Sequence, residues 1–233
     1  LYAGVEFSPV PDELASILSR LSKNYAPFKE LPGDEYALSC KVNTRPGSER
    51  IVRAAFEFAR RAGRKKVTVV HKANVVRATD GLFLDCAREV AKEYLDIALS
   101  DANIDAVCMW LLKNPFDYDV LVAPNLYGDI ISDLCAQMVG GLGFGCSANI
   151  GEDLAVFEPT HGSAPKHAGM NKVNPLATIL AAKMMLDWLG EADLAARLEA
   201  AVAAVIAEGQ ARTYDMGGDS TTLQMAEAVA AKL

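Results

Sequence analysis

Two aspartates, Asp129 and Asp133, lie four positions apart just after an apolar run, residues 120–123, that predicts a buried strand. Helical spacing begins just after Gly128, and side chains four residues apart point to the same side of a helix. Two carboxylates so placed repel each other unless a cation lies between them, and their oxygen atoms suit Mg²⁺ or Mn²⁺. The spacing also fits a helix cap at Asp129 with a solvated carboxylate at Asp133.

Lys72 follows a β-branched run, residues 67–71, that predicts another buried strand. Enzymes with α/β folds keep their sites at the carboxyl ends of parallel strands, and desolvation there can turn a lysine into a general base. A surface lysine at a strand end is the plainer alternative. Asp105 opens an apolar helical segment, residues 104–112, and taken alone it fits a helix cap.

The segment from Glu158 to His167 is short, rich in Gly and Pro, and holds two of the three histidines. Such a loop can fold round a ligand with its backbone N–H groups exposed, while Lys166 meets a phosphate. The spacing from His161 to His167 matches no zinc pattern, and an ordinary surface turn is the alternative. The glycine-rich run 140–145 is a flexible break, which we interpret as a domain boundary. It does not fit GxGxxG and follows a helix rather than a strand, which argues against a simple Rossmann fold.

Predicted strands alternate with predicted helices along much of the chain, which indicates an α/β fold with a mostly parallel sheet. Ser48 is the expected cap of a helix that Gly63 ends, and Ser220 or Thr221 is the expected cap of the final helix. The expected strands are 1–7, 36–42, 67–71, 95–97 and 120–123, and the expected helices before the last are 12–21, 49–62, 79–94, 104–112, 130–139, 175–189 and 191–208.

The bulk composition describes a globular protein of 233 residues, 51% hydrophobic and 23% charged. A net charge of −7 argues against nucleic acid or an anionic membrane as the main partner. Five scattered cysteines without a CxxC pair are typical of reduced thiols in a cytoplasmic protein. No apolar run is long enough for a bilayer and no signal peptide opens the chain, which begins at Leu1, so we expect a piece of a longer protein.

Four motifs occur in a characteristic order: HKAN at 71–74, NLYGDIISD at 125–133, FEPTHGSAPK at 157–166 and NP at 174–175. They resemble the isocitrate/isopropylmalate dehydrogenases, a family of β-decarboxylating enzymes that act on isocitrate, 3-isopropylmalate, homoisocitrate or tartrate. The resemblance runs over the whole chain, but the family has a further N-terminal segment with serine, asparagine and arginine groups that bind the substrate, and this chain lacks it.

The resemblance implies an isopropylmalate dehydrogenase-like fold with two α/β domains and an arm that clasps the neighbour in a homodimer with shared active sites. On that template, residues 1–44 form the arm and residues 45–139 form the small domain. Residues 140–233 then form the C-terminal half of the large cofactor-binding domain.

The resemblance also implies residue roles. Asp105, reaching in from a partner subunit, would hold Mg²⁺ or Mn²⁺ together with Asp129 and Asp133. Lys72 matches the general base, Tyr2 matches the acid, and Asn74 would touch the substrate or the nicotinamide. The positions that match cofactor contacts are Glu158, His161, Gly162, Ser163, Ala164, Lys166, His167, Val173, Asn174, Tyr214 and Asp215.

The opening residues, Leu1-Tyr2-Ala3-Gly4-Val5-Glu6, look more like the isocitrate enzymes than the isopropylmalate enzymes. The resemblance therefore implies oxidation of isocitrate, a 2-hydroxy tricarboxylic acid of the tricarboxylic acid cycle, to 2-oxoglutarate in the cytoplasm. A dicarboxylic substrate, 3-isopropylmalate, remains an alternative, as do homoisocitrate and an inactive fragment or regulatory subunit.

The cofactor is expected to be NADP rather than NAD. Lys166, Val173 and Tyr214 resemble the NADP type of isocitrate enzyme. Two departures from that type are His167, which replaces the usual tyrosine, and the Gly217-Gly218 pair, which lacks the expected arginine.

Overall fold

The computed structural model describes residues 5–233. They divide into two units, one that ends at Asp129 and one that starts at Ile130, so the division falls inside helix α5 (Asn125–Met138). The glycine-rich run that we expected at the boundary follows this helix. The three-part division into an arm, a small domain and half of a large domain stays a prediction.

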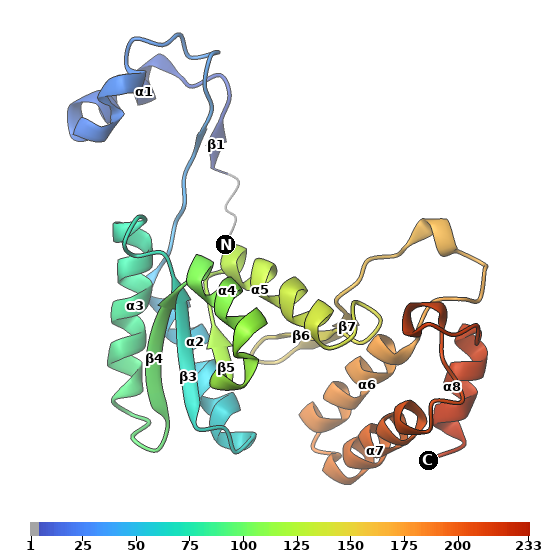
Figure 1. The fold of residues 1–233 in the computed structure, drawn as a ribbon. Helices are drawn as coiled ribbons and strands as arrows, with labels where there is room; N and C mark the ends of the chain where they lie inside the picture. Colours follow the sequence, from blue (N-terminus) through green and yellow to red (C-terminus); the bar gives the residue numbers. More distant parts are fainter. Residues whose placement is uncertain (1–4) are drawn as a thin grey trace. The chain divides into compact units, whose positions relative to one another are not determined.

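A three-stranded parallel sheet is the centre of the first unit, and it confirms the predicted α/β class. Strand β3 (Lys66–His71) lies between β4 (Ala98–Asn103) and β5 (Val120–Val122), as Figure 1 shows. The register pairs His71 with Asn103 and Val69 with Val122. Parallel pairing brings the carboxyl ends of all three strands to one edge of the sheet.

Helices cover both faces of this sheet. Helices α2 (Arg45–Arg61) and α3 (Arg77–Ala91) pack against the face that carries Val67 and Val69, and their side chains form one buried core with it. In that core the rings of Phe56 and Tyr94 are stacked with centroids 4.9 Å apart. Val70 points to the opposite face, which α4 (Ile104–Lys113) contacts, and a short 3-10 turn, η2 (Pro115–Asp117), leads from α4 to β5.

Several predicted boundaries in this unit are wrong. Helix α2 begins at Arg45 because Thr44, not Ser48, caps it by accepting the N–H of Gly47. A strand occupies residues 98–103 rather than 95–97, because pairing with β3 overrides the low strand propensity of its Asp and Asn residues. Helix α5 begins at Asn125 and continues through Gly128, so Asp129 lies inside the helix and is not its cap.

Residues before α2 form a separate small group of elements. Strand β1 (Glu6–Phe7) pairs antiparallel with β2 (Leu38–Ser39), so the strand expected over 36–42 is only two residues long. Between them lie α1 (Asp12–Leu21), as predicted, and the 3-10 segment η1 (Lys23–Phe28). Helix α1 has no buried residue, so its apolar side, with Ile17 44% exposed, is uncovered in one copy of the chain.

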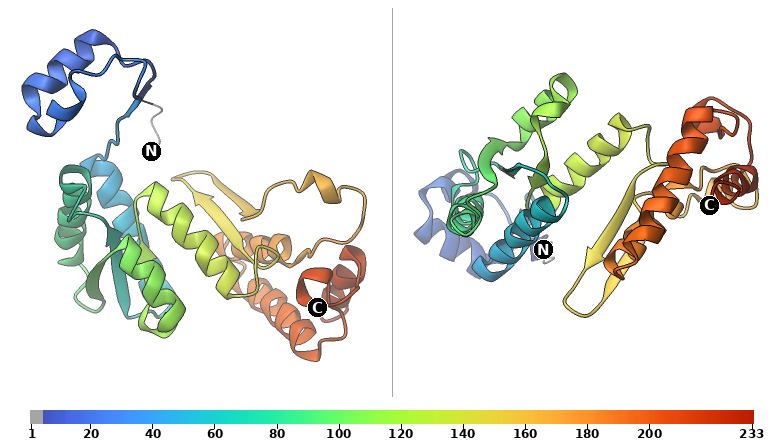
Figure 2. Two further views of the ribbon diagram at one scale, coloured as in Figure 1. Left: turned by 45° about the horizontal axis from the view of Figure 1, so that its top comes forward. Right: turned by 90° about the horizontal axis from the view of Figure 1, so that it is seen from below.

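The second unit is built from a hairpin and three helices. Strands β6 (Cys146–Ile150) and β7 (Ala155–Pro159) pair antiparallel and lie against α6 (Leu176–Trp188), as Figures 1 and 2 show. Helix α6 packs on α7 (Ala192–Glu208), which contacts α8 (Thr222–Ala230). Leu176, Val202 and Met225 are among the buried side chains of this core.

The predicted helix ends in this unit agree well with the structure. Gly209 ends α7 in the left-handed region at φ 63. Thr221 caps α8 in a reciprocal capping box with Gln224. Within residues 5–233, no helix combines the length and the hydrophobicity that crossing a bilayer requires.

Candidate functional site

An ion pair lies at the carboxyl edge of the parallel sheet. Lys72 directly follows β3, and Asp105 is the second residue of α4, which follows β4. Their side chains meet, with Nζ of Lys72 2.6 Å from Oδ1 of Asp105. The hydrogen bond from Lys72 is the main cause that lowers the pKa of Asp105 below its usual range. The structure thus brings together two residues that lie 33 positions apart in the sequence.

Side chains also fix the backbone of the turn that carries Lys72. The N–H of Ala73 donates to Nδ1 of His71 over 3.0 Å, and buried Asp80 accepts the N–H of Lys72 over 2.8 Å. Because Nδ1 of His71 is an acceptor, its Nε2 carries the hydrogen and donates to Asp101, 3.1 Å away. Asn74 lies exposed in the same turn.

Asp129 and Asp133 both lie exposed on α5, four residues apart, as the predicted one-sided arrangement requires. Nδ2 of Asn125 is 3.4 Å from Oδ2 of Asp129. Within the described part of the chain, no three His, Cys, Asp or Glu side chains are grouped so that they could hold a metal ion. A single chain therefore does not assemble the predicted trio with Asp105, and a contribution from a second copy stays a prediction. Tyr2 lies outside the described residues.

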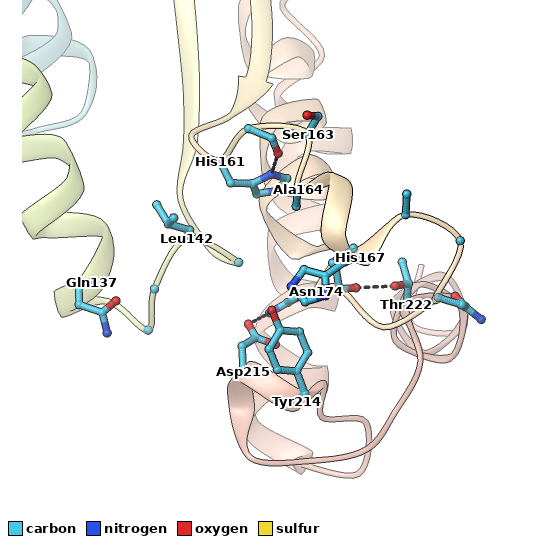
Figure 3. Close-up of a pocket in the computed structure, with 18 residues that line it drawn as sticks. Gln137, Leu142, His161, Ser163, Ala164, His167, Asn174, Tyr214, Asp215 and Thr222 are labelled. Atoms are coloured by element: carbon cyan, nitrogen blue, oxygen red, sulfur yellow. Dashed lines mark hydrogen bonds between the residues drawn. The ribbon is translucent and has the colours of Figure 1, made fainter.

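The second unit contains a pocket of about 710 Å³ (Figure 3). That volume is within the range of small-molecule sites. Nine of the predicted cofactor positions line it: His161, Gly162, Ser163, Ala164, His167, Val173, Asn174, Tyr214 and Asp215.

A chain of neutral and charged hydrogen bonds holds one wall of this pocket. Buried Asn174 accepts the N–H of Leu176 through Oδ1 and donates through Nδ2 to Asp215, both over 3.0 Å. The hydroxyl of Thr213 donates to the other oxygen of Asp215. Figure 3 shows Asn174, Asp215 and Tyr214 converging at this point. Gly143 lies so close that a Cβ there would be 2.4 Å from Oδ2 of Asp215, so only glycine fits.

The loop on the other wall has an unusual backbone. Ala164 has φ 45 and Asn171 has φ 49, and a left-handed alanine is a strained conformation that the surrounding structure must hold. His167 has a buried Nδ1 for which the described residues provide no hydrogen-bond partner. The His167 ring is 5.9 Å from the ring of Tyr214, and the ammonium of Lys172 lies 4.5 Å from that same ring.

Two predicted cofactor positions do not line the pocket. The carboxylate of Glu158 accepts a hydrogen bond from Asn149 across the β6–β7 hairpin, 3.0 Å away. Lys166 is exposed in the short 3-10 turn η3 (Pro165–His167). The structure adds lining residues that were not predicted: Gln137, Gly140, Gly141, Leu142, Gly143, Ala168, Gly169, Asn171 and Thr222.

The glycine-rich run was the signal that could have identified this missed wall. From the sequence alone, residues 140–145 are interpreted only as a flexible domain boundary, because they do not fit the dinucleotide fingerprint. Gly140 and Gly141 instead have φ 118 and 100, which only glycine adopts readily, and they bring the backbone to the pocket. A cluster of glycines that is not a fingerprint motif can still mark close approach of backbone to a ligand.

Comparison with known proteins agrees with the resemblance. The family model for isocitrate/isopropylmalate dehydrogenase matches residues 21–229. A 3-isopropylmalate dehydrogenase from Archaeoglobus fulgidus is 52% identical over 83% of this chain and 59% of its own length. A probable isocitrate dehydrogenase [NAD] subunit alpha, mitochondrial, from Caenorhabditis elegans is 50% identical over 84% of this chain and 54% of its own length.

A solved structure is similar over the whole chain. The crystal structure of isocitrate dehydrogenase from Methylococcus capsulatus matches with a TM-score of 0.85 and 48% identity, over 100% of this chain and 63% of the other. The chain thus spans somewhat more than half the length of the curated relatives that it matches.

Proposed function

The chain belongs to the isocitrate/isopropylmalate dehydrogenase family, and we propose that it contributes the general base, the metal ligands and part of the cofactor site to an NAD(P)-dependent oxidative decarboxylation of isocitrate. The observation that carries the proposal is the pair of Lys72 and Asp105 at the carboxyl edge of the parallel sheet. This is where the family motif, the topology and the chemistry of a general base coincide.

The proposed metal ligands are Asp105, Asp129 and Asp133. They offer only carboxylate oxygens, which fits Mg²⁺ or Mn²⁺ better than softer metals, and Asp105 is held in the charged form. When bound, the divalent ion would act as a Lewis acid that polarises the oxygen on the carbon being oxidised. Because no such trio is grouped within the described residues of one chain, we propose that a second copy supplies Asp105, and with it the bonded Lys72.

As a general base Lys72 must be a neutral amine, so its ammonium would first release its proton to solvent when the carboxylate of Asp105 turns to the divalent ion. Nζ of Lys72 would then accept the hydroxyl proton of the substrate, and a bound nicotinamide would serve as the hydride acceptor. Carbon dioxide is then lost, and Tyr2 returns a proton to the resulting enol carbon. Asp105 and the hydrogen bonds at His71 and Asp80 keep the lysine and its turn in position. Asn74, exposed in that turn, is placed to contact the substrate or the nicotinamide.

The pocket in the second unit is proposed to bind the nucleotide part of the cofactor. Its volume of about 710 Å³ and its polar wall of Asn174 and Asp215 suit an adenosine group. A preference for NADP rests on Lys166, Val173 and Tyr214, and the ammonium of Lys172, 4.5 Å from the Tyr214 ring, is a further candidate for the phosphate. Several relatives carry NAD in their names, so the ratio of kcat/KM for the two cofactors decides this point.

The choice of isocitrate rests on the Tyr-Ala-Gly sequence at the start of the chain, and relatives of both substrate types are similar to this protein. Steady-state assays with isocitrate, 3-isopropylmalate and homoisocitrate in the presence of Mn²⁺ separate the alternatives. A higher kcat/KM for 3-isopropylmalate would overturn the choice. Absence of turnover with every substrate and cofactor would favour a regulatory subunit or an inactive fragment.

A homodimer in the cytoplasm is also part of the proposal. On α4, Met109 is 57% exposed and Leu112 is 69% exposed, and such apolar side chains are typical of a surface that another copy covers. Sedimentation of the purified protein, compared with a Leu112→Glu variant, tests the dimer. We expect the variant to sediment as a monomer, and a monomeric parent protein would contradict the assignment.

The substitution Lys72→Met, made in the purified full-length protein, tests the role of Lys72. This variant should lose turnover while it still binds the nucleotide, because the base is removed and the pocket lies in another unit. The matched control is Lys92→Met, which removes an exposed lysine of the same unit that pairs with Glu89. If Lys72→Met and Lys92→Met are equally active, the proposed function is wrong.

A further inference from the structure

One fully buried carboxylate joins three separate segments of the first unit. Asp80 lies in the first turn of α3 and is 0% exposed. Its Oδ2 accepts the backbone N–H of Lys72 over 2.8 Å, and its Oδ1 accepts the ammonium of Lys41. The hydroxyl of Tyr127 bonds the same carboxyl group. The three donors come from the segment that precedes α2, the turn after β3 and the start of α5.

Neighbouring contacts strengthen this junction. Nδ2 of Asn43 donates to the carbonyl of Thr79 over 2.9 Å, so the segment before α2 is tied to two successive residues at the start of α3. The ammonium of Lys41 also lies 4.5 Å from the centre of the Tyr127 ring. Burying a carboxylate is costly unless it is paired and hydrogen-bonded, so the three segments are held together by the groups that satisfy Asp80.

We propose that Asp80 is a positioning residue that sets the placement of the Lys72 turn and of the start of α5 relative to residues 40–44. Through the backbone of Lys72 it fixes where the proposed base stands, and through Tyr127 it fixes the helix that carries Asp129. The effect of Asp80 on catalysis rests on the proposed function, whereas the hydrogen-bonded junction around Asp80 is independent of it. Residues 40–44 connect the β1–β2 region to α2. A shift of these residues would therefore displace the Lys72 turn, because Lys41 is bonded to Asp80 and Asp80 is bonded to the backbone of Lys72.

Asp80→Asn is the informative change because it preserves size. An asparagine has one acceptor oxygen for the three donors, and its NH₂ group is itself a donor that faces the remaining donors. At least one of the three segments therefore loses its hydrogen bond to residue 80. The matched control is Val90→Ala, a core substitution ten residues further along the same helix at a site 3% exposed. Both variants are expected to lower the melting temperature.

Hydrogen exchange separates positioning from simple structural support. In Asp80→Asn, exchange should speed up in three places at once, residues 40–44, 72–76 and 125–129. In Val90→Ala, it should speed up only in α3 and the core that packs on it. If exchange in Asp80→Asn changes only within α3, the inference is overturned whatever the enzyme activity.

Kinetics supply the second readout. Asp80→Asn should reduce kcat by about 10- to 100-fold with little change in KM, since a displaced base affects the reaction step more than substrate binding. Lys41→Met, which removes one tie and leaves the bond from Asp80 to the Lys72 amide, should reduce kcat less. If Asp80→Asn keeps full activity while Lys72→Met is inactive, the positioning role is wrong and the proposed function stands. If Lys72→Met is itself active, the proposed function fails as well.

Discussion

The two units hold their functional groups in different ways. In the first unit, ion pairs at the edge of the sheet keep these groups in place: Lys72 pairs with Asp105, and Lys41 pairs with Asp80. In the second unit, one wall of the pocket is held by the hydrogen bonds of Asn174 and Asp215, and the rest depends on closely placed backbone: Gly140, Gly141 and Ala164 have positive φ, and Gly143 leaves no room for a Cβ. Activity should therefore be most sensitive to substitutions that change charge in the first unit, and nucleotide binding should be most sensitive to substitutions that enlarge a side chain in the second unit.

The largest expected effect is that of Asp129→Asn. The variant should abolish Mn²⁺-dependent turnover, because a neutral amide oxygen binds a divalent ion much more weakly than a carboxylate does, while the exposed position leaves the fold nearly unchanged. Circular dichroism and an assay over a range of Mn²⁺ concentrations check this. The control is Asp153→Asn, an exposed aspartate in the turn of the β6–β7 hairpin. Unaltered activity of Asp129→Asn would remove the metal assignment.

Gly143→Ala tests the other side of the comparison. The new Cβ would overlap Oδ2 of Asp215, and overpacking of this kind costs about 1–3 kcal/mol, so we expect nucleotide affinity to fall by about 10- to 100-fold. The control is Gly81→Ala in α3, where a Cβ meets nothing within 4 Å and the helix should gain about 0.5–1 kcal/mol. Calorimetric titration with NADP and NAD measures the affinity. Equal affinities in the two variants would show that the pocket does not bind the nucleotide.

Lys166→Asp tests whether charge matters in the second unit as well. If the lysine meets the 2′-phosphate, the preference for NADP over NAD should drop by about 10- to 100-fold, the value of a hydrogen bond to a charged group. The kcat/KM ratio for the two cofactors is the measure, and Lys92→Asp is the control for a lost surface cation. A ratio that does not move would contradict the assignment of Lys166 to the 2′-phosphate.

The smallest effect is expected at a charge cluster of the second unit that lies outside the pocket. Lys183 bonds Glu199 over 2.9 Å and Asp187 over 3.0 Å, which links α6 to α7, and mainly the bond to Glu199 raises the pKa of the lysine. A raised lysine pKa means that this stabilisation is fully present below the unfolded value of 10.5 and is lost as pH rises through the higher folded value. Lys183→Met should cost about 1 kcal/mol or less at pH 7.

Denaturant unfolding at pH 7 and above pH 11 checks this prediction. The difference between Lys183→Met and the parent should shrink at the higher pH, while nucleotide affinity at pH 7 stays the same in both. A loss of nucleotide affinity at pH 7 would mean that charge supports the pocket too, and the contrast between the two units would fail.

Sequence patterns predicted the features that residue type alone determines. The β-branched run of β3 and the caps at Gly209 and Thr221 agree with the structure. The missed features depend on tertiary partners. Strand β4 contains Asp101 and Asn103, which disfavour strands, and it forms because β3 pairs with it.

The same limit applies to the site. The composition of the segment from Glu158 to His167 predicts a binding loop, and five of its residues line the pocket: His161, Gly162, Ser163, Ala164 and His167. Gly143 was missed because its function is steric and appears only when Asn174 and Asp215 are placed beside it. Asp80 was missed because an aspartate in the first turn of a helix is common, and only its three donors mark it as a junction.

Mixed dimers test the central claim most directly. Lys72→Met and Asp129→Asn are each expected to be inactive, and co-expression of the two produces dimers that carry one of each. If one copy supplies Lys72 and Asp105 and the other supplies Asp129 and Asp133, each mixed dimer has one intact site, and the mixture should recover about a quarter of the parent activity. A mixture that forms dimers and stays inactive would contradict the shared site.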